Sequence, residues 1–283
     1  NISPKTCYEW ASETILNKSQ AILPPKISMK PAPGVFCNVM PSIIDKTGGI
    51  KVVTRYPERI PALESFLTIY DVESGENLAL MDATWITAMR TGAVAAHSIL
   101  LLAKKDFSTI GMVGLGNTAR AALLVLAEVY DGRKLQIKLK KYDGQEILFA
   151  QRFSSYKNLE FFFVDTAQEI ISGSDVVISA VTYMPEDFCE DKYYDPGVLV
   201  VPIHTLGFTN CDLFFDKVFA DDYGHVCHFK NFDKFKKFAE ALNSHLLNGT
   251  EPPFVKNWKT QVVAKAAIKY DADEIVSPIF IVS

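Results

Sequence analysis

The feature that most constrains this chain is a glycine-containing turn between an apolar run and a helical stretch. Residues 109–113 are almost entirely apolar, and the pattern Gly114-x-Gly116-x-x-Ala119 follows before a helix-periodic segment over 120–130. Further runs of strand and helix type alternate as far as residue 204. Because strands that alternate with helices pair in parallel, we predict an α/β fold with a Rossmann-type doubly wound parallel sheet.

The small residues in this turn have the spacing of a dinucleotide-binding loop. Gly114 permits a tight turn, Gly116 lets the backbone approach a pyrophosphate, and Ala119 allows the helix to pack closely on the strand. Backbone N–H groups at the helix start, at Asn117 and Thr118, would meet the anion with the help of the helix macrodipole. The alternative is a turn that needs glycines only for its own conformation.

The end of the second strand, over residues 135–141, bears on the choice of nucleotide. A carboxylate there binds a ribose 2′-hydroxyl, whereas cations favour a 2′-phosphate. The strand ends in Lys140 and Lys141, so we expect NAD or NADP, with a slight preference for NADP. Two alternatives stay open: the lysines belong to a solvent-facing strand surface, or Asp143 binds the ribose.

The first hundred residues differ in style from the rest. A helix is expected over 6–18, then short strands separated by proline and glycine turns, and then a helix over 82–105 with Asp82 as its N-cap. Such strands predict a smaller α+β domain with an antiparallel sheet. Composition and strand style both change near Lys105, where we place the domain boundary.

Two cations in this first domain are candidates for substrate chemistry. Arg90 falls on the apolar side of the second helix, where a guanidinium needs an anionic partner, either a neighbouring acid or a substrate carboxylate. Lys51 lies in a β-branched strand, where desolvation would lower its pKa and suit it to proton transfer. The alternative for Lys51 is a lysine that protects an edge strand from aggregation.

His204 is a further catalytic candidate because it follows the apolar strand over 198–203. Doubly wound sheets bind ligands at the carboxyl ends of their strands, where His204 would lie. Histidines also gather over 221–228, but their spacing fits no metal site that we recognise. We therefore expect no bound metal.

Composition excludes several classes of function. A net charge of −4, with 29 basic and 33 acidic residues, argues against nucleic-acid binding. The segment closest to a membrane-spanning run, over 93–103, is interrupted by His97 and too short, and the first residues show no signal pattern. Five widely spaced cysteines indicate reduced thiols. We expect a cytoplasmic protein with neither nucleic-acid nor membrane partners.

Several sequence blocks resemble the ornithine cyclodeaminase/mu-crystallin family. They follow the family's order over residues 26–207 and comprise Asn38-Val-Met-Pro41, Gly49-Ile-Lys51-Val-Val53, Asp82-x-x-x-x-Thr87-x-x-Arg90-Thr-Gly-Ala93 and the glycine turn. The resemblance implies a substrate-binding and dimerisation domain over 1–105, rejoined by 260–283, and an NAD(P)-binding Rossmann domain over 106–259. It also implies a homodimer.

The resemblance also assigns roles to single residues. Lys51 and Arg90 match the substrate-site lysine and arginine, and Lys26 stands where many members have a carboxylate-binding arginine. Members act on amino acids or cyclic imino acids by hydride transfer at the α-carbon.

Two positions depart from the cyclodeaminase pattern. Asn38 replaces a glutamate and Leu206 replaces an aspartate, which weakens the case for strict ornithine cyclodeamination. We therefore expect an NAD(P)-dependent imine reductase or amino-acid dehydrogenase. The alternatives are an ammonia-releasing cyclodeaminase with catalytic NAD, and a non-catalytic NADPH-dependent protein that binds a small ligand.

Overall fold

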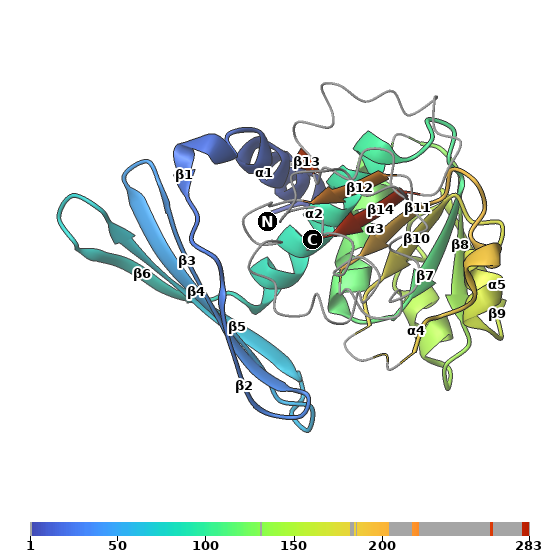
Figure 1. Cartoon of the computed structure of the whole chain (residues 1–283), viewed down its shortest axis with the longest axis horizontal. Helices are drawn as coiled ribbons and strands as arrows, with labels where there is room; N and C mark the ends of the chain where they lie inside the picture. The colour runs from blue at the N-terminus through green and yellow to red at the C-terminus, as the bar shows by residue number, and fades with distance from the viewer. Residues whose placement is uncertain are drawn as a thin grey trace, which may run out of the picture.

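The protein combines an antiparallel sheet and a parallel sheet, with three mutually packed helices between them (Figure 1). The computed structural model describes residues 2–130, 132–181, 184, 186–203, 217–220, 261–262 and 279–282. The antiparallel sheet extends to one side as a single layer, and the parallel sheet lies on the other side with helices against it (Figure 1).

The antiparallel sheet is built from the N-terminal strands. Its order is β1-β3-β4-β5-β6, and β2 also pairs with β3. Every pairing in it is antiparallel, as predicted. The strands are β1 (Ala21–Ile22), β2 (Ile27–Ala32), β3 (Val35–Ile44), β4 (Thr47–Arg55), β5 (Leu63–Asp71) and β6 (Asn77–Asp82).

The parallel sheet confirms the prediction of a Rossmann-type doubly wound fold. Its order is β13-β12-β14-β11-β10-β7-β8-β9, so the chain moves outward from β7 to β9 and then returns to β10 on the other side of β7. The adjacent strands β7 and β10 mark the switch point of the sheet, and sheets of this kind bind ligands at the carboxyl ends of the strands there. The strands are β7 (Thr109–Val113), β8 (Leu135–Lys140), β9 (Leu159–Val164), β10 (Val176–Ser179), β11 (Leu199–Pro202), β12 (Lys217–Ala220), β13 (Gln261–Val262) and β14 (Ile279–Val282).

The helices differ in what they pack against. The first three pack on one another between the sheets, whereas α5 contacts β7, β8 and β9. Asp82 accepts a hydrogen bond from the N–H of Thr84 at 2.7 Å, but it ends β6, so the second helix begins two residues later than predicted. The helices are α1 (Pro4–Leu16), α2 (Thr84–Leu102), α3 (Asn117–Val129), α4 (Gln145–Gln151) and α5 (Ala167–Ile171), with short 3₁₀ turns at Lys18–Gln20 and Asp191–Tyr193.

The pattern of apolar residues in each parallel strand follows how many of its faces are buried. The residues of β10 and β11 are all buried because both faces of the central strands are covered. Strand β8 instead alternates, with Leu135, Ile137 and Leu139 buried and the intervening residues more exposed. On this wetter face Lys138 donates to the carbonyl of Ser172 in the turn after α5. The solvent-facing alternative for the β8 lysines therefore describes the strand correctly.

The C-terminal strands lie in the parallel sheet. We expected residues 260–283 to rejoin the first domain, but β14 pairs with β11 and β12, and β13 pairs with β12. The sequence of β14 is apolar throughout, which is typical of a strand in a parallel sheet. The division into 1–105 and 106–259 otherwise stays a prediction.

Helix α2 passes, by length and composition alone, as a helix that could cross a membrane. It is the single such helix in the described part of the chain, although its longest uninterrupted apolar run is short. More than half of its most apolar stretch is buried inside the protein, and it packs against α1 and α3. A buried core helix of this kind satisfies the same criterion.

We predict that Gly92→Ala destabilises the protein by tightening the contact between α2 and α3. An added Cβ would lie 2.5 Å from backbone atoms of Ala121 and Ala122, so one helix must move. Overpacking of about 1–3 kcal/mol outweighs the gain in helix propensity of about 1 kcal/mol. Urea denaturation should show a lower free energy of unfolding.

The matched control for this prediction is Gly116→Ala. No described atom lies within 4 Å of a Cβ at that position, so its stability should be unchanged. Equal stability of both variants and the unchanged protein would contradict the prediction.

Candidate functional site

Lys51 occupies the middle of the antiparallel sheet. In β4 it lies opposite Met40 of β3 and Leu67 of β5, so its strand is paired on both sides. The edge-strand alternative is therefore wrong for Lys51. Cross-strand partners point to the same face of a sheet, so Lys51 shares a face with Val53 and with Ser65, the partner of Val53. Val53 and Ser65 are both buried, which shows that this face is covered.

The start of α2 covers that face and carries Arg90. Thr87 is buried and hydrogen-bonds the hydroxyl of Ser65 at 2.7 Å. Arg90 follows Thr87 by three residues, so it lies one turn further along the same side of the helix. Met89 and Ala93 are buried as expected, but the Arg90 side chain itself is exposed. The expectation of an inward, buried guanidinium is therefore corrected: Arg90 lies at the rim of the apolar side.

Lys26 completes a group of three cations. It immediately precedes β2, whose residues Ile27 and Ser28 pair with Val39 and Asn38 of β3. Continuing this register places Lys26 beside Met40, which is in turn the partner of Lys51. Its side chain is exposed. Lys26, Met40 and Lys51 thus occupy neighbouring positions across the sheet, and Arg90 is carried by α2, which packs on the same face.

Electrostatics support the proximity of these three residues. The pKa of Lys51 is lowered from 10.5 to about 7, first by burial and then by the positive charges of Arg90 and Lys26. Burial near two like charges disfavours the charged form of the amine, so both its protonated and neutral forms are populated near neutral pH. Binding of an anion such as a carboxylate would relieve the repulsion among the three cations. The structure thus brings together the three predicted substrate residues of the first domain.

The glycine turn lies at the carboxyl end of β7. Gly114 has a φ of 92°, and a Cβ there would lie 2.8 Å from the carbonyl carbon of Ala180, so conformation and packing both require glycine. Gly116 has an ordinary φ of −78° and open space around it. Neither its backbone nor its described neighbours require glycine, whereas close approach of a phosphate would. The turn's own conformation therefore requires glycine at Gly114, and the dinucleotide-loop role of Gly116 stays a prediction.

Helix α3 starts at Asn117, directly after the turn. Its first N–H groups, including those of Asn117 and Thr118, point away from the helix body toward its start. Ala119 is fully buried, as its predicted packing role requires. These residues fit the pyrophosphate of a dinucleotide.

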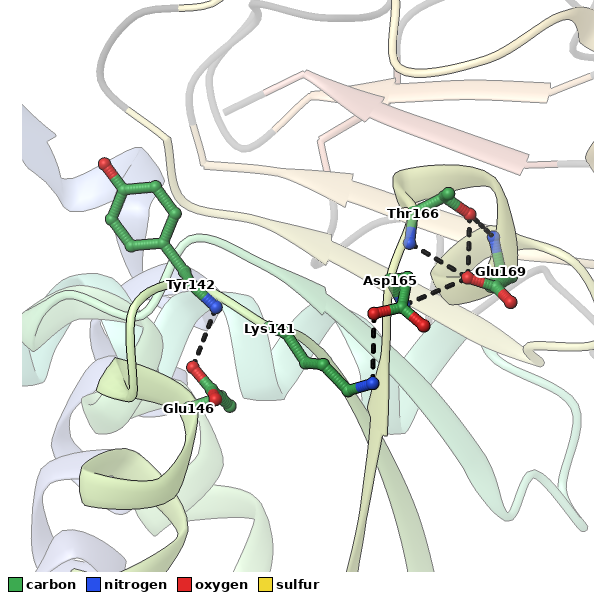
Figure 2. A network of polar contacts seen from close by, with 6 residues as sticks. All are labelled: Lys141, Tyr142, Glu146, Asp165, Thr166 and Glu169. Carbon is green, nitrogen blue, oxygen red and sulfur yellow. Dashed lines mark hydrogen bonds and ion pairs between the residues drawn. The ribbon is translucent and has the colours of Figure 1, made fainter.

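The loop after β8 lies next to the glycine turn and is held by a polar network (Figure 2). Met112 of β7 pairs with Leu139, which places Lys141 level with Gly114. The Nζ of Lys141 pairs with the Oδ1 of Asp165 at 3.0 Å, and the Lys140 side chain is exposed. Of the two lysines predicted to face a 2′-phosphate, Lys141 therefore already forms an ion pair with Asp165, and Lys140 is exposed to solvent.

Two acidic residues in this network escaped sequence reasoning. Glu146 accepts a hydrogen bond from the N–H of Tyr142 at 2.7 Å, which lowers the pKa of its carboxyl (Figure 2). Glu169 closes a capping box with Thr166 at the start of α5. The Thr-x-x-Glu pattern over 166–169 was a usable signal for the second residue. Nothing in the local sequence marks Glu146, because its partner is a backbone N–H.

The remaining predictions lie elsewhere. His204, Leu206 and the histidines over 221–228 lie outside the described residues. Within the described part of the chain, no group of three or more His, Cys, Asp or Glu side chains is arranged to hold a metal ion.

We predict that Lys51 titrates near pH 7, measurable by NMR of labelled lysine side chains. Below its folded pKa of about 7 the buried charge destabilises the fold, and the unfolded chain keeps the proton up to about 10.5. This group therefore makes the free energy of unfolding rise with pH between those two values.

Arg90→Gln should raise the pKa of Lys51, because it removes the larger of the two charge effects on this amine. Lys46→Gln, which removes a lysine paired with Glu73, should leave it unchanged. A Lys51 pKa near 10.5 in the unaltered protein would refute the arrangement described above.

Comparison with known proteins places this arrangement in context. The sequence model of the ornithine cyclodeaminase/mu-crystallin family matches residues 7–213. The chain is 32% identical over 145 residues to alanine dehydrogenase of Archaeoglobus fulgidus, covering 50% of this chain and 42% of that protein. It is 26% identical over 168 residues to the ketimine reductase mu-crystallin of Mus musculus, covering 57% and 52%. The chain thus spans about half the length of these relatives.

Solved structures share the fold. The Thermococcus litoralis Δ1-pyrroline-2-carboxylate reductase, in complex with NADH and L-proline, has a TM-score of 0.77 and 21% identity, covering 100% of this chain and 88% of that one. An archaeal alanine dehydrogenase dimer with bound NAD has a TM-score of 0.74 and 18% identity, covering 99% and 85%. Because the family match extends over most of the sequence and agrees with the landmarks found in it, this chain belongs to the ornithine cyclodeaminase/mu-crystallin family.

Proposed function

We propose that this protein is an NAD(P)-dependent oxidoreductase that reduces an imino acid, or oxidises the matching amino acid, at the α-carbon. The supporting observation is the contact between α2 and α3. Gly92, two residues after Arg90, packs against Ala121, which is about 6 Å along α3 from its start at Asn117. The cation group and the glycine turn are therefore joined by two helices in direct backbone contact. The family relatives named alanine dehydrogenase and ketimine reductase agree with this proposal.

The first domain would bind and orient the substrate. Arg90, helped by Lys26, would hold the substrate carboxylate by charge-assisted hydrogen bonds. Lys51 would donate or accept the proton at the substrate nitrogen, because a pKa of about 7 keeps both of its protonation states populated at neutral pH. His204 stays a further candidate catalytic residue. Positioning and charge complementarity would supply most of the acceleration.

The second domain would hold the nicotinamide dinucleotide, which supplies hydride chemistry when bound. Gly114, Gly116 and the N–H groups of Asn117 and Thr118 would cradle its pyrophosphate, with Ala119 packed behind them. Lys140 supports a slight preference for NADP over NAD. Lys141 supports it less, since it already pairs with Asp165.

One observation bears on the competing reaction of ammonia release. Asn38, on the same sheet face as Lys51, supplies a neutral amide where cyclodeaminases have a glutamate, so it favours net reduction or oxidation. Steady-state consumption of NADPH separates the two reactions, since cyclodeamination consumes none. Ligand binding with no turnover of either kind would leave the binding-protein alternative.

The proposed assembly is a homodimer formed through the other face of the antiparallel sheet. On that face Ile27, Phe66 and Leu80 are 59%, 48% and 72% exposed. Exposed apolar side chains gathered on one sheet face are typical of a protein interface.

We further propose a reducing, cytoplasmic location, which the free thiols of Cys7, Cys37 and Cys189 support.

Two variants test the proposed chemistry on a panel of α-imino and α-amino acids with NADPH and NADH. Lys51→Met should lower kcat by about 10²–10⁴-fold, the usual contribution of a general acid or base, and keep nucleotide affinity. Gly116→Ala should keep stability but weaken nucleotide binding roughly tenfold or more, through overpacking against the phosphate. Full activity of Lys51→Met, or unchanged nucleotide affinity of Gly116→Ala, would overturn the proposal.

A separate prediction concerns the dimer. Leu80→Glu should convert the dimer to a monomer, because a carboxylate cannot be buried there without a partner. Light scattering after gel filtration measures the mass. Ile147→Glu, at an exposed apolar position on α4, should leave the dimer intact. A dimeric Leu80→Glu protein would place the interface elsewhere.

A further inference from the structure

Ser65 of β5 holds the start of α2 with all three of its polar groups. Its N–H donates to the hydroxyl of Thr84 at 3.1 Å, and its carbonyl accepts from the N–H of Ala83 at 2.8 Å. Its hydroxyl hydrogen-bonds that of Thr87 at 2.7 Å. Ser65 and Thr87 are only 6% and 9% exposed, so this last bond is shielded from water. Three hydrogen bonds from this one residue therefore fix the first turn of α2 on β5.

The hydroxyl pair lies near both proposed substrate cations. Ser65 is the cross-strand partner of Val53, which is two residues from Lys51 on the same face of β4. Thr87 is three residues before Arg90, on the same side of α2. A shift or rotation of α2 over the sheet would therefore move Arg90 relative to Lys51, and it would also break the bond between Ser65 and Thr87.

We propose that Ser65 and Thr87 are a positioning pair that fixes Arg90 relative to Lys51. The inference deepens the proposed function, on which it rests, by assigning the Thr87 of the Asp-x-x-x-x-Thr-x-x-Arg block to geometry and not to substrate contact. Asp82 fixes where α2 begins through its bond to Thr84, and the hydroxyl pair fixes how the helix is turned about its axis.

Hydroxyl groups suit this task better than apolar groups. Apolar contacts are non-directional, so a helix can slide or rotate on them at little cost. A buried hydroxyl that loses its partner is penalised for the lost hydrogen bond, which gives the contact one preferred geometry. The pair thus makes the orientation of α2 specific at the point where Arg90 leaves it.

The test is the coupling between Arg90 and Lys51, measured through the pKa of Lys51 by NMR. In the unaltered protein Arg90→Gln should shift this pKa upward. In a Thr87→Val background, which removes the hydroxyl and keeps the side-chain shape, the pKa should already be raised, and the further shift on Arg90→Gln should be smaller. Thr87→Ser keeps the hydroxyl and should restore both values.

Ser98→Ala is the matched control. It removes another buried hydroxyl of α2, one that bonds only the carbonyl of Val94 within the same helix. It should leave both the Lys51 pKa and its response to Arg90→Gln unchanged. A variant that only loosened the fold would not separate Thr87 from Ser98 in this way.

Ser65→Ala repeats the test from the strand and serves if Thr87→Val fails to fold. If neither Ser65→Ala nor Thr87→Val alters the effect of Arg90→Gln on Lys51, the positioning role is refuted. The titration needs neither nucleotide nor substrate, so its outcome is independent of whether the proposed reaction occurs. Loss of turnover in Lys51→Met with no change of coupling in Thr87→Val would reject this inference alone.

Discussion

The arrangement of this protein depends on a lysine that is enclosed near like charges. Lys51 sits in the centre of a six-stranded sheet, partly covered by α2, with Arg90 and Lys26 close enough to lower its pKa to about 7. Enclosing an amine among cations opposes folding, since desolvation and repulsion both act against its charged form. Binding of an anion would relieve this cost, which supports the carboxylate-bearing substrate of the proposed function.

Helix α2 connects this cation group to the proposed nucleotide site. Its first turns are hydrogen-bonded to Ser65 of β5. In its middle, Gly92 packs against Ala121 of α3, about one helical turn after the glycine turn. One helix therefore contacts both the sheet that carries the cation group and the helix that follows the glycine turn. In the proposed function this helix would help to set the separation between substrate and dinucleotide that hydride transfer requires.

Sequence reasoning succeeded where a pattern has a local cause. The glycine turn, the buried strands around it and the antiparallel N-terminal strands follow from short-range sterics and hydrophobic alternation, and the structure confirms them. It failed for the C-terminal strands β13 and β14, whose neighbours in the sheet are distant in sequence. It also placed Arg90 inward, because helical periodicity identifies a side but not where the covering surface ends.

By itself the sequence determined that a strand, a tight turn and a helix would follow one another with the spacing of a phosphate-binding loop, because Gly114, Gly116 and Ala119 lie within a few residues of one another. It also named Lys26, Lys51 and Arg90 as separate candidates. Only the tertiary structure decided that these cations meet, that β4 is a central strand, and that Lys141 pairs with Asp165. The reason is physical: the pKa of a titratable group depends on its neighbours in space, and strand pairing and helix packing determine which residues those neighbours are.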